Sequence, residues 1–123
     1  MTNKNKIRFT KTAAIKMKKA IESSGGVEVF AIGLVNADVN VYEITVHCRG
    51  NKHSVPALLK RSKTGQVVIH NHPSGVLEAS DADMHLANLY GDDGIGVVIV
   101  NNQMTRDFWV VEPYLKKETS VST

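Results

Sequence analysis

The chain has 123 residues, of which 42% are hydrophobic and 22% are charged, which is enough for one domain with its own core and too short for two. Its single cysteine, Cys48, excludes an internal disulfide, so a reducing, cytoplasmic setting is expected. No apolar run approaches the roughly 20 residues of a membrane span, and the polar start lacks the apolar core of a secretion signal. No association with a membrane is therefore expected.

The net charge of +3 is unevenly distributed along the chain. Residues 1–22 contain seven basic residues and one glutamate, a net of +6, whereas the rest contains eight basic and eleven acidic residues, a net of −3. A basic balance can indicate a nucleic-acid partner, but a helix with a solvated basic face gives the same pattern. We expect residues 1–9 to be a polar basic arm, residues 10–114 to be the domain and residues 115–123 to be a frayed polar tail.

Three elements are predicted in the first half of the domain. A helix over residues 10–24 begins at a threonine that can cap it, and its apolar residues recur at helical spacing. Residues 27–35 are apolar on both faces except at Glu28, which is typical of a central strand. Over residues 39–48 apolar and polar residues alternate, so these two strands are expected to form a hairpin.

Five further elements are predicted in the second half. They are a helix over residues 54–62, a short buried strand over 66–69, a helix over 80–90 and strands over 95–100 and 106–112. The complete order, α-β-β-α-β-α-β-β, predicts an α/β domain in which helices flank a mixed β-sheet.

The stretch over residues 67–83, VVIHNHPSGVLEASDAD, contains most of the candidate chemistry. His70 and His72 lie two residues apart at a strand end, and extended backbone places both imidazoles on one side, within reach of one ion. Ser80 has the character of an N-cap, and Asp83 follows in a capping box that has Asp in place of Glu, so its carboxylate points back toward the strand end. Two imidazoles and one carboxylate form the ligand set of a catalytic zinc site.

A zinc site of this kind needs a base, and Glu28 is the candidate. It is the sole charge in an apolar strand, where an isolated buried carboxylate is costly. The alternative for Glu28 is an edge position that faces solvent. The Ser80 hydroxyl can donate to a developing oxyanion, in competition with its capping role. Asp81 is a rival ligand, although its place in the first helical turn favours a solvated charge.

The remaining histidines and the cysteine give weaker signals. His85 lies two residues beyond Asp83 on the same helix and is expected to point elsewhere, as a surface or packing residue. His47 and His53 flank the end of the hairpin and can line a substrate groove. Cys48 alternates with the buried face of its strand, so core packing is favoured over catalysis.

At these residues the sequence resembles the JAMM (MPN+/JAB) metalloprotease family. The family pattern is an upstream glutamate, then H-x-H-P, six residues and S-x-x-D, and the text HNHPSG is most similar to the RadC-like bacterial branch. The resemblance covers residues 27–111 and implies a cytidine-deaminase-like α/β fold. It also implies a site with Zn2+ on His70, His72 and Asp83, Glu28 as the general acid/base and Ser80 at the oxyanion.

The resemblance implies a zinc-dependent metallopeptidase or isopeptidase that acts on peptide or isopeptide bonds, with ubiquitin-like or sulfur-carrier proteins as candidate substrates. The chain is too short for the insertions with which eukaryotic deubiquitinases grip one ubiquitin linkage, so a linkage-specific enzyme is not expected. The alternative is a DNA-associated repair or replication module, which the RadC resemblance and the basic first helix suggest. A binding-only domain is disfavoured by the intact set of five residues. The oligomeric state is left open.

Overall fold

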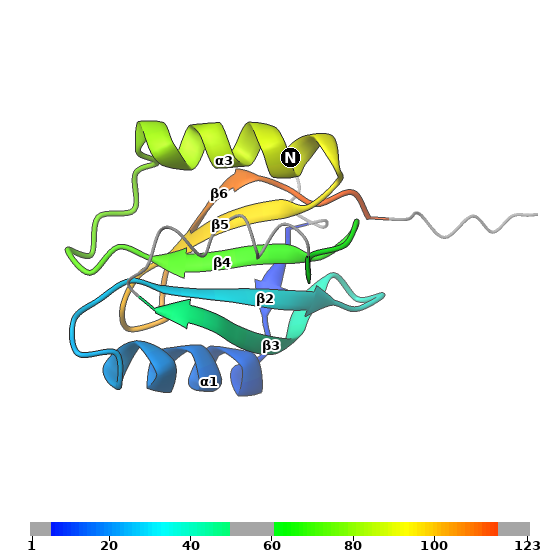
Figure 1. The fold of residues 1–123 in the computed structure, drawn as a ribbon. Coiled ribbons are helices and arrows are strands. Elements are labelled where there is room, and N and C mark those ends of the chain that lie inside the picture. Colours follow the sequence, from blue (N-terminus) through cyan, green and yellow to red (C-terminus); the bar gives the residue numbers. More distant parts are fainter. Residues whose placement is uncertain (1–5, 50–60, 116–123) are drawn as a thin grey trace, which may run out of the picture.

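The computed structural model describes residues 6–49 and 61–115. Within them, six strands form one mixed sheet in the order β1-β3-β2-β4-β5-β6, and helices α1 and α3 cover opposite faces of it (Figure 1). The elements are β1 (Arg8–Phe9), α1 (Lys11–Glu22), β2 (Val29–Val35), β3 (Asn40–Arg49), β4 (Val67–Asn71), α3 (Asp81–Asp92), β5 (Gly96–Val100) and β6 (Asp107–Val111). The predicted α/β class is confirmed. The predicted helix over residues 54–62 lies almost wholly outside the described residues.

Helix α1 forms because a capped start is followed by an apolar stripe at helical spacing. The Thr10 hydroxyl accepts a hydrogen bond from the Ala13 amide at 3.2 Å, which satisfies one of the free N–H groups of the first turn. The residues that the helix buries are Ala13, Met17, Ala20 and Ile21. This stripe packs on the sheet as the sequence predicts, and it covers the face opposite α3.

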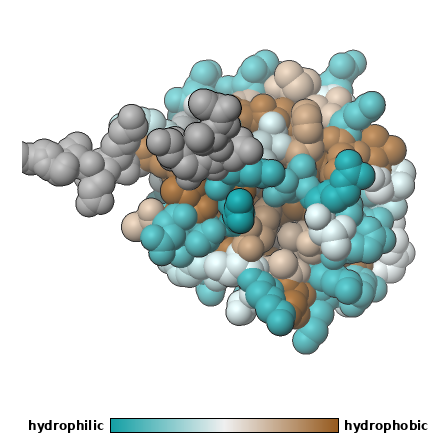
Figure 2. Space-filling view, turned by 180° about the vertical axis from the view of Figure 1, so that it is seen from behind, coloured by the Kyte–Doolittle hydropathy of each residue, from teal (hydrophilic) through white to brown (hydrophobic). Residues whose placement is uncertain are grey.

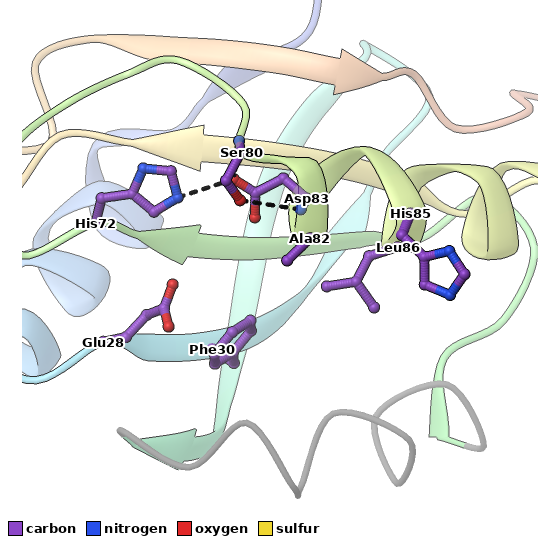
Figure 3. Close-up of a pocket in the computed structure, with 8 residues that line it drawn as sticks. All are labelled: Glu28, Phe30, His72, Ser80, Ala82, Asp83, His85 and Leu86. Atoms are coloured by element: carbon purple, nitrogen blue, oxygen red, sulfur yellow. Dashed lines mark hydrogen bonds and ion pairs between the residues drawn. The ribbon is translucent and has the colours of Figure 1, made fainter.

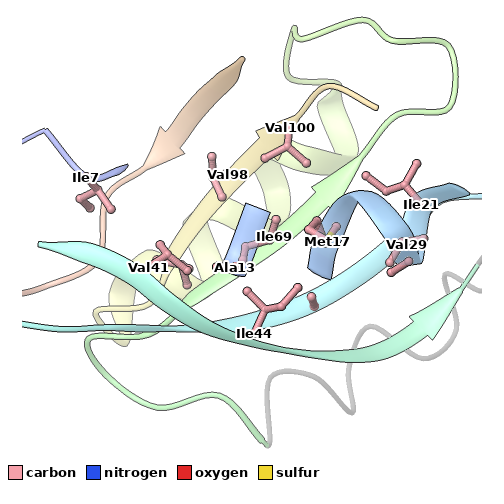
Figure 4. Packing of buried hydrophobic residues seen from close by; sticks show 13 residues of the cluster. Ile7, Ala13, Met17, Ile21, Val29, Val41, Ile44, Ile69, Val98 and Val100 are labelled. Atoms are coloured by element: carbon pink, nitrogen blue, oxygen red, sulfur yellow. The ribbon is translucent and has the colours of Figure 1, made fainter. Parts of the chain in front are cut away.

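The sheet separates two cores because the side chains of its central strands alternate between its faces. Val29 and Ala31 of β2 belong to the cluster under α1, whereas Phe30 and Ile32 belong to the cluster under α3. Figure 4 shows the first of these, in which side chains from α1 meet those of β2, β3, β4 and β5. Both clusters consist mainly of β-branched residues and alanines, which fit a pleated surface closely.

The predicted hairpin is confirmed, and β2 is the strand that joins it to the rest of the sheet. It pairs antiparallel with β3 on one side and with β4 on the other, where Phe30 lies opposite His70. Strand β4 pairs parallel with β5, and β5 pairs antiparallel with β6. Strand β4 extends through His70 and Asn71, two residues beyond the predicted strand, so the ends of β2 and β4 meet at the same edge.

Strand β1 is an element that the sequence pattern does not predict. Arg8 and Phe9 pair parallel with Asn40 and Val41 of β3, and the preceding Ile7 is only 2% exposed. The expected polar arm therefore contributes a strand and a core residue at its end. A two-residue strand between charged neighbours is too short to show a period of two.

The sheet curls enough to bring rings on its two edge strands, β1 and β6, near each other. Phe9 of β1 and Trp109 of β6 have ring centroids 6.5 Å apart.

No helix of the described residues is long and apolar enough to cross a membrane. Seen from behind the view of Figure 1, the surface shows hydrophobic side chains in separate areas among hydrophilic ones (Figure 2).

Gly33→Ala tests the close packing of β2 against its neighbours under α1. A Cβ atom at Gly33 would lie 2.8 Å from Val41 Cγ1 and 2.9 Å from side-chain atoms of Ile69 and Val67. We expect the substitution to lower the free energy of unfolding by about 1–3 kcal/mol, because such overpacking forces strain into a dense core. Urea unfolding measures this loss.

The control for this experiment is Thr45→Ser, an exposed position on β3 opposite Ile32. It is expected to change the free energy of unfolding by less than about 0.5 kcal/mol. A Gly33→Ala protein as stable as the wild type would contradict the packing described here.

Candidate metal centre

The end of β4 carries the first of the two histidines into the interior. His70 is 1% exposed, and its ring stacks on that of Phe30, the opposite residue on β2, with centroids 5.1 Å apart. His72 follows just beyond the strand and is half-buried, with its ring 5.2 Å from that of His70. The two imidazoles lie on the same side of the strand end, as their spacing predicts.

The first turn of α3 supplies the carboxylate, and a capping box holds it. The Ser80 hydroxyl accepts a hydrogen bond from the Asp83 amide at 3.1 Å, and Asp83 Oδ2 accepts one from the Ser80 amide at 2.9 Å. The predicted capping box with Asp in place of Glu is therefore confirmed. Asp83 is 4% exposed, so its carboxylate points inward, toward the end of β4.

Asp83 contacts both imidazoles. Its Oδ1 lies 2.9 Å from Nε2 of His70. Its Oδ2 lies 3.0 Å from Nε2 of His72, a contact drawn as a dashed line in Figure 3. Nδ1 of His70 is buried and has no hydrogen-bond partner among the described residues. Phe30 and Asp83 are thus the contacts that orient the His70 ring. The structure brings together the three residues that the sequence analysis assigns to a metal.

The hydrogen bonds of His72 show that a positive charge belongs between it and Asp83. Nδ1 of His72 lies 2.9 Å from the backbone oxygen of Val76, which can only accept, so Nδ1 carries a hydrogen. A neutral His72 then points the lone pair of Nε2 at a carboxylate oxygen 3.0 Å away. Two acceptors face each other at this distance only if a proton or a metal cation lies between them.

The spacing of these atoms fits a small tetrahedral cation. Ligand atoms about 2.0–2.1 Å from tetrahedral zinc lie about 3.3 Å from each other, close to the 2.9 and 3.0 Å found between Asp83 and the two histidines. A carboxylate with two imidazoles is also the donor set that zinc prefers. The residues therefore fit a zinc ion.

The environment of Asp83 keeps its carboxyl group ionised. Burial by itself would raise its pKa, but the hydrogen bond with His70 and the one from the Ser80 amide outweigh this effect and lower the pKa well below the usual range. Asp83 is therefore an anion at neutral pH, as a metal ligand must be.

Glu28 joins this group from the neighbouring strand. It is half-buried, and ligand atoms of Glu28, His70 and His72 all lie within 4.8 Å of one another, so these three residues can also hold a metal ion. The pairing of Phe30 with His70 explains the position, because two residues further along an antiparallel pair Glu28 falls opposite His72 on the same face. The Glu28 carboxylate points toward the His72–Asp83 pair (Figure 3). The alternative of an edge position that simply faces solvent is therefore not what the structure shows.

A pocket of about 430 Å³ opens beside these residues. Its walls are polar at one end and apolar at the other, and they comprise Glu28, Phe30, His72, Ser80, Ala82, Asp83, His85 and Leu86. Sequence reasoning misses the apolar end, although positions three and four residues after Ala82 share one face of a helix and give a signal for it. His85 is exposed, as expected of a surface residue, but it also lines the pocket from that face, which the sequence does not predict.

The other candidate residues lie outside the pocket lining. Asp81, the rival ligand, is exposed. Cys48 packs against the core under α3, as predicted, and its thiol pKa is raised by burial and by the charge of Glu28. The pKa of His47 is lowered by burial and by the charge of Arg61. His53 lies outside the described residues.

Comparison with known proteins places this fold and site in a family. A family model described as a RadC-like JAB domain matches residues 7–92, a range that contains both histidines and all three carboxyl or hydroxyl residues of the site. The chain belongs to the RadC-like JAB domain family. The resemblance inferred from the sequence is thereby confirmed. The match begins at Ile7, which agrees with the place of β1 in the sheet.

Two further comparisons add to this picture. Among proteins with curated descriptions, none matches the chain. Among solved structures, the chain is similar to the solution structure of protein DSY2949 from Desulfitobacterium hafniense, with 17% sequence identity and a TM-score of 0.47. That similarity covers 84% of this chain and 80% of the other.

The lowered pKa of Asp83 predicts a specific pH dependence of the metal-free protein. A carboxyl group with a depressed folded pKa stabilises the fold above its unfolded pKa, about 3.9, and this contribution is lost as the pH falls toward the folded value. Asp83→Asn removes the contribution. Thermal unfolding in a chelator should therefore show a smaller fall in Tm between about pH 4 and pH 2 for Asp83→Asn than for the wild type.

Asp81→Asn provides the matched control, because Asp81 lies in the same helical turn but is exposed. Its Tm is expected to follow that of the wild type across this range. Parallel curves for Asp83→Asn and the wild type would contradict the role assigned to the Asp83 hydrogen bonds.

Proposed function

We propose that this RadC-like JAB domain is a zinc-dependent peptidase or isopeptidase. The observation that carries the proposal is the Asp83 carboxylate, which contacts Nε2 of both His70 and His72 beside a pocket that also contains Glu28. We assign zinc to His70, His72 and Asp83. Membership of a JAB family that includes hydrolases supports this assignment.

We assign different roles to the carboxylates of Asp83 and Glu28 because their contacts differ. Asp83 is clamped by the capping box and by two imidazoles, which keeps it ionised and suits a ligand. Glu28 forms no ion pair or hydrogen bond within the described part of the chain, so no contact there commits its carboxylate to another role. Glu28 is therefore assigned as the general acid/base.

Hydrolysis then follows from the roles of this chain's residues. Bound zinc would polarise the scissile carbonyl and lower the pKa of the attacking water. Glu28 takes a proton from that water and delivers it to the leaving nitrogen as the bond breaks. Ser80 accepts from the Asp83 amide through an oxygen lone pair, so its hydroxyl hydrogen stays available to the oxyanion. Capping and catalysis are compatible for this serine.

The substrate is assigned to proteins or peptides, with ubiquitin-like and sulfur-carrier proteins as the first candidates. The apolar end of the pocket, formed by Phe30, Ala82 and Leu86, offers a surface for an apolar part of the substrate next to the scissile bond. We place the activity in the cytoplasm, where a lone thiol such as Cys48 stays reduced.

A nucleic-acid role is the second candidate, and one structural observation bears on it. Helix α1, with the exposed Lys18 and Lys19, covers the face of the sheet opposite α3 (Figure 1). The pocket is lined from the α3 side, by Ala82, Asp83 and Leu86 among others. Binding there would leave the metal centre open. Such binding would weaken steeply with salt, and Lys18→Glu with Lys19→Glu would abolish it.

Glu28→Gln tests whether Glu28 acts as the general acid/base or as a metal ligand. We expect this variant to bind zinc as the wild type does and to lose about 10²–10⁴-fold in hydrolysis, because glutamine keeps the shape but cannot act as a general acid or base near neutral pH. Asp83→Asn should instead lose zinc. Elemental analysis of the purified proteins measures zinc, and mass spectrometry of a panel of peptides and ubiquitin-like fusions measures hydrolysis.

Three outcomes of these measurements would contradict the proposal. Absence of zinc from the wild type after reconstitution at neutral pH would show that the assignment of zinc to this site is wrong. Loss of zinc in Glu28→Gln would make Glu28 a ligand, as its distance from the histidines also permits. Unchanged hydrolysis in Glu28→Gln would remove it from the mechanism.

Substitutions of Ser80 separate its capping role from its catalytic one. Ser80→Ala is expected to cost about 1 kcal/mol of stability and to lower kcat by about 10²-fold or more, because the cap and the hydroxyl donor are both lost. Ser80→Asp restores a capping acceptor but supplies no hydroxyl donor. It should therefore recover the Tm and leave kcat low. Recovery of kcat in Ser80→Asp would show that Ser80 acts through the cap alone.

A further inference from the structure

The Glu28 end of β2 and the His72 end of β4 are joined by a hydrogen-bonded pair of side-chain amides on the face of the sheet opposite the pocket. Asn71, between the two histidines, is 1% exposed, so its amide must find partners inside the protein. Its Oδ1 accepts from the backbone N–H of Val29 at 2.8 Å. Val29 is the residue that follows Glu28.

The second amide continues this connection to the turn after His72. Nδ2 of Asn71 donates to Oδ1 of Asn102 at 2.9 Å, and Nδ2 of Asn102 donates to the backbone oxygen of Pro73 at 3.0 Å. Asn102 lies two residues beyond β5, in the turn before β6. Three hydrogen bonds thus connect the backbone beside Glu28 to the backbone beside His72.

The direction of these hydrogen bonds is determined at both ends. The Val29 amide can only donate, so Oδ1 of Asn71 must face it, and the Pro73 carbonyl can only accept, so Nδ2 of Asn102 must face it. The bond between the two asparagines then has one direction only. An aspartate at either position would break the series, because it has no hydrogen to donate at neutral pH.

The position of Asn71 also explains why β2 and β4 remain aligned at this edge. The backbone pairing of β2 with β4 runs from Gly33 and Val67 to Phe30 and His70. At the next position the Asn71 side chain bonds to Val29, which extends the connection by one residue toward Glu28. The Asn71 side chain thereby holds Glu28 opposite His72.

We propose that Asn71 and Asn102 are positioning residues whose amide relay sets the distance between the Glu28 carboxylate and the histidine ligands. The name amide relay denotes their two side chains and the three hydrogen bonds described above. The relay touches neither substrate nor metal, because it lies on the other side of the strand from the pocket lining. Its effect on hydrolysis rests on the proposed function, whereas its effect on the position of Glu28 does not.

Asn102→Ala is the variant that tests the relay, because it removes two of the three bonds at a half-buried turn position. In the metal-free full chain, we expect NMR to show shifted backbone amides at Glu28 and Val29 and faster hydrogen exchange at Val29. In the zinc-loaded protein, we expect kcat to fall roughly 10- to 100-fold, with KM and zinc content unchanged.

Two further variants complete the experiment. Asn101→Ala is the matched control, because among the residues that the structure describes the Asn101 side chain bonds within its own turn alone, to Thr105 and Arg106. It should leave the Glu28 and Val29 amides and kcat as in the wild type. Asn102→Asp keeps an acceptor for Asn71 but sets a carboxylate oxygen against the Pro73 carbonyl, so it should recover only part of the protection of the Val29 amide.

Unchanged Glu28 and Val29 amides in Asn102→Ala would overturn the relay, whatever the protein hydrolyses. An equal fall of kcat in Asn101→Ala would also overturn it, because a general loosening of the turn would then explain both variants. If the wild type binds no zinc and cleaves no substrate, the proposed function fails, and the NMR measurements still decide whether the relay positions Glu28.

Discussion

The candidate centre depends on one carboxylate that is held from two directions. Asp83 accepts the Ser80 amide through the capping box and faces Nε2 of both histidines at 2.9 and 3.0 Å. Because the box is part of the start of α3, the helix cannot shift along the sheet without breaking these contacts. Because a neutral His72 and Asp83 would present two acceptors to each other, the arrangement favours a cation between them.

The candidate site and the hydrogen bonds that align its strands lie on opposite faces of the sheet. On the α3 side lie His70, the Phe30 ring that stacks on it and the pocket, and on the α1 side lies Asn71 with its bonds to Val29 and Asn102. Alternation along β4 puts neighbouring residues on opposite faces. One short strand therefore places His70 against Asp83 on one face of the sheet and Asn71 against Val29 on the other.

Much of the site could be predicted where the relevant contacts are local. The capping box joins residues three positions apart and the two histidines lie two positions apart, so helix and strand periods are sufficient to predict both. The place of His85 beside the pocket could not be predicted, because it depends on how the Ala82 face of α3 lies relative to Phe30 of β2. Strand β1 was too short for any periodic signal.

The sequence by itself determined the α/β class, the hairpin, the two helix starts and the residue types that suit zinc. Only the tertiary structure decided that Glu28 faces the histidines 42 and 44 positions away and that Asn71 bonds to Val29 across the sheet. The physical reason is register. A single residue of slip between β2 and β4 would turn Glu28 to the other face, and no local pattern specifies that register. Packing of both sheet faces under α1 and α3, together with the Asn71 bond, selects it.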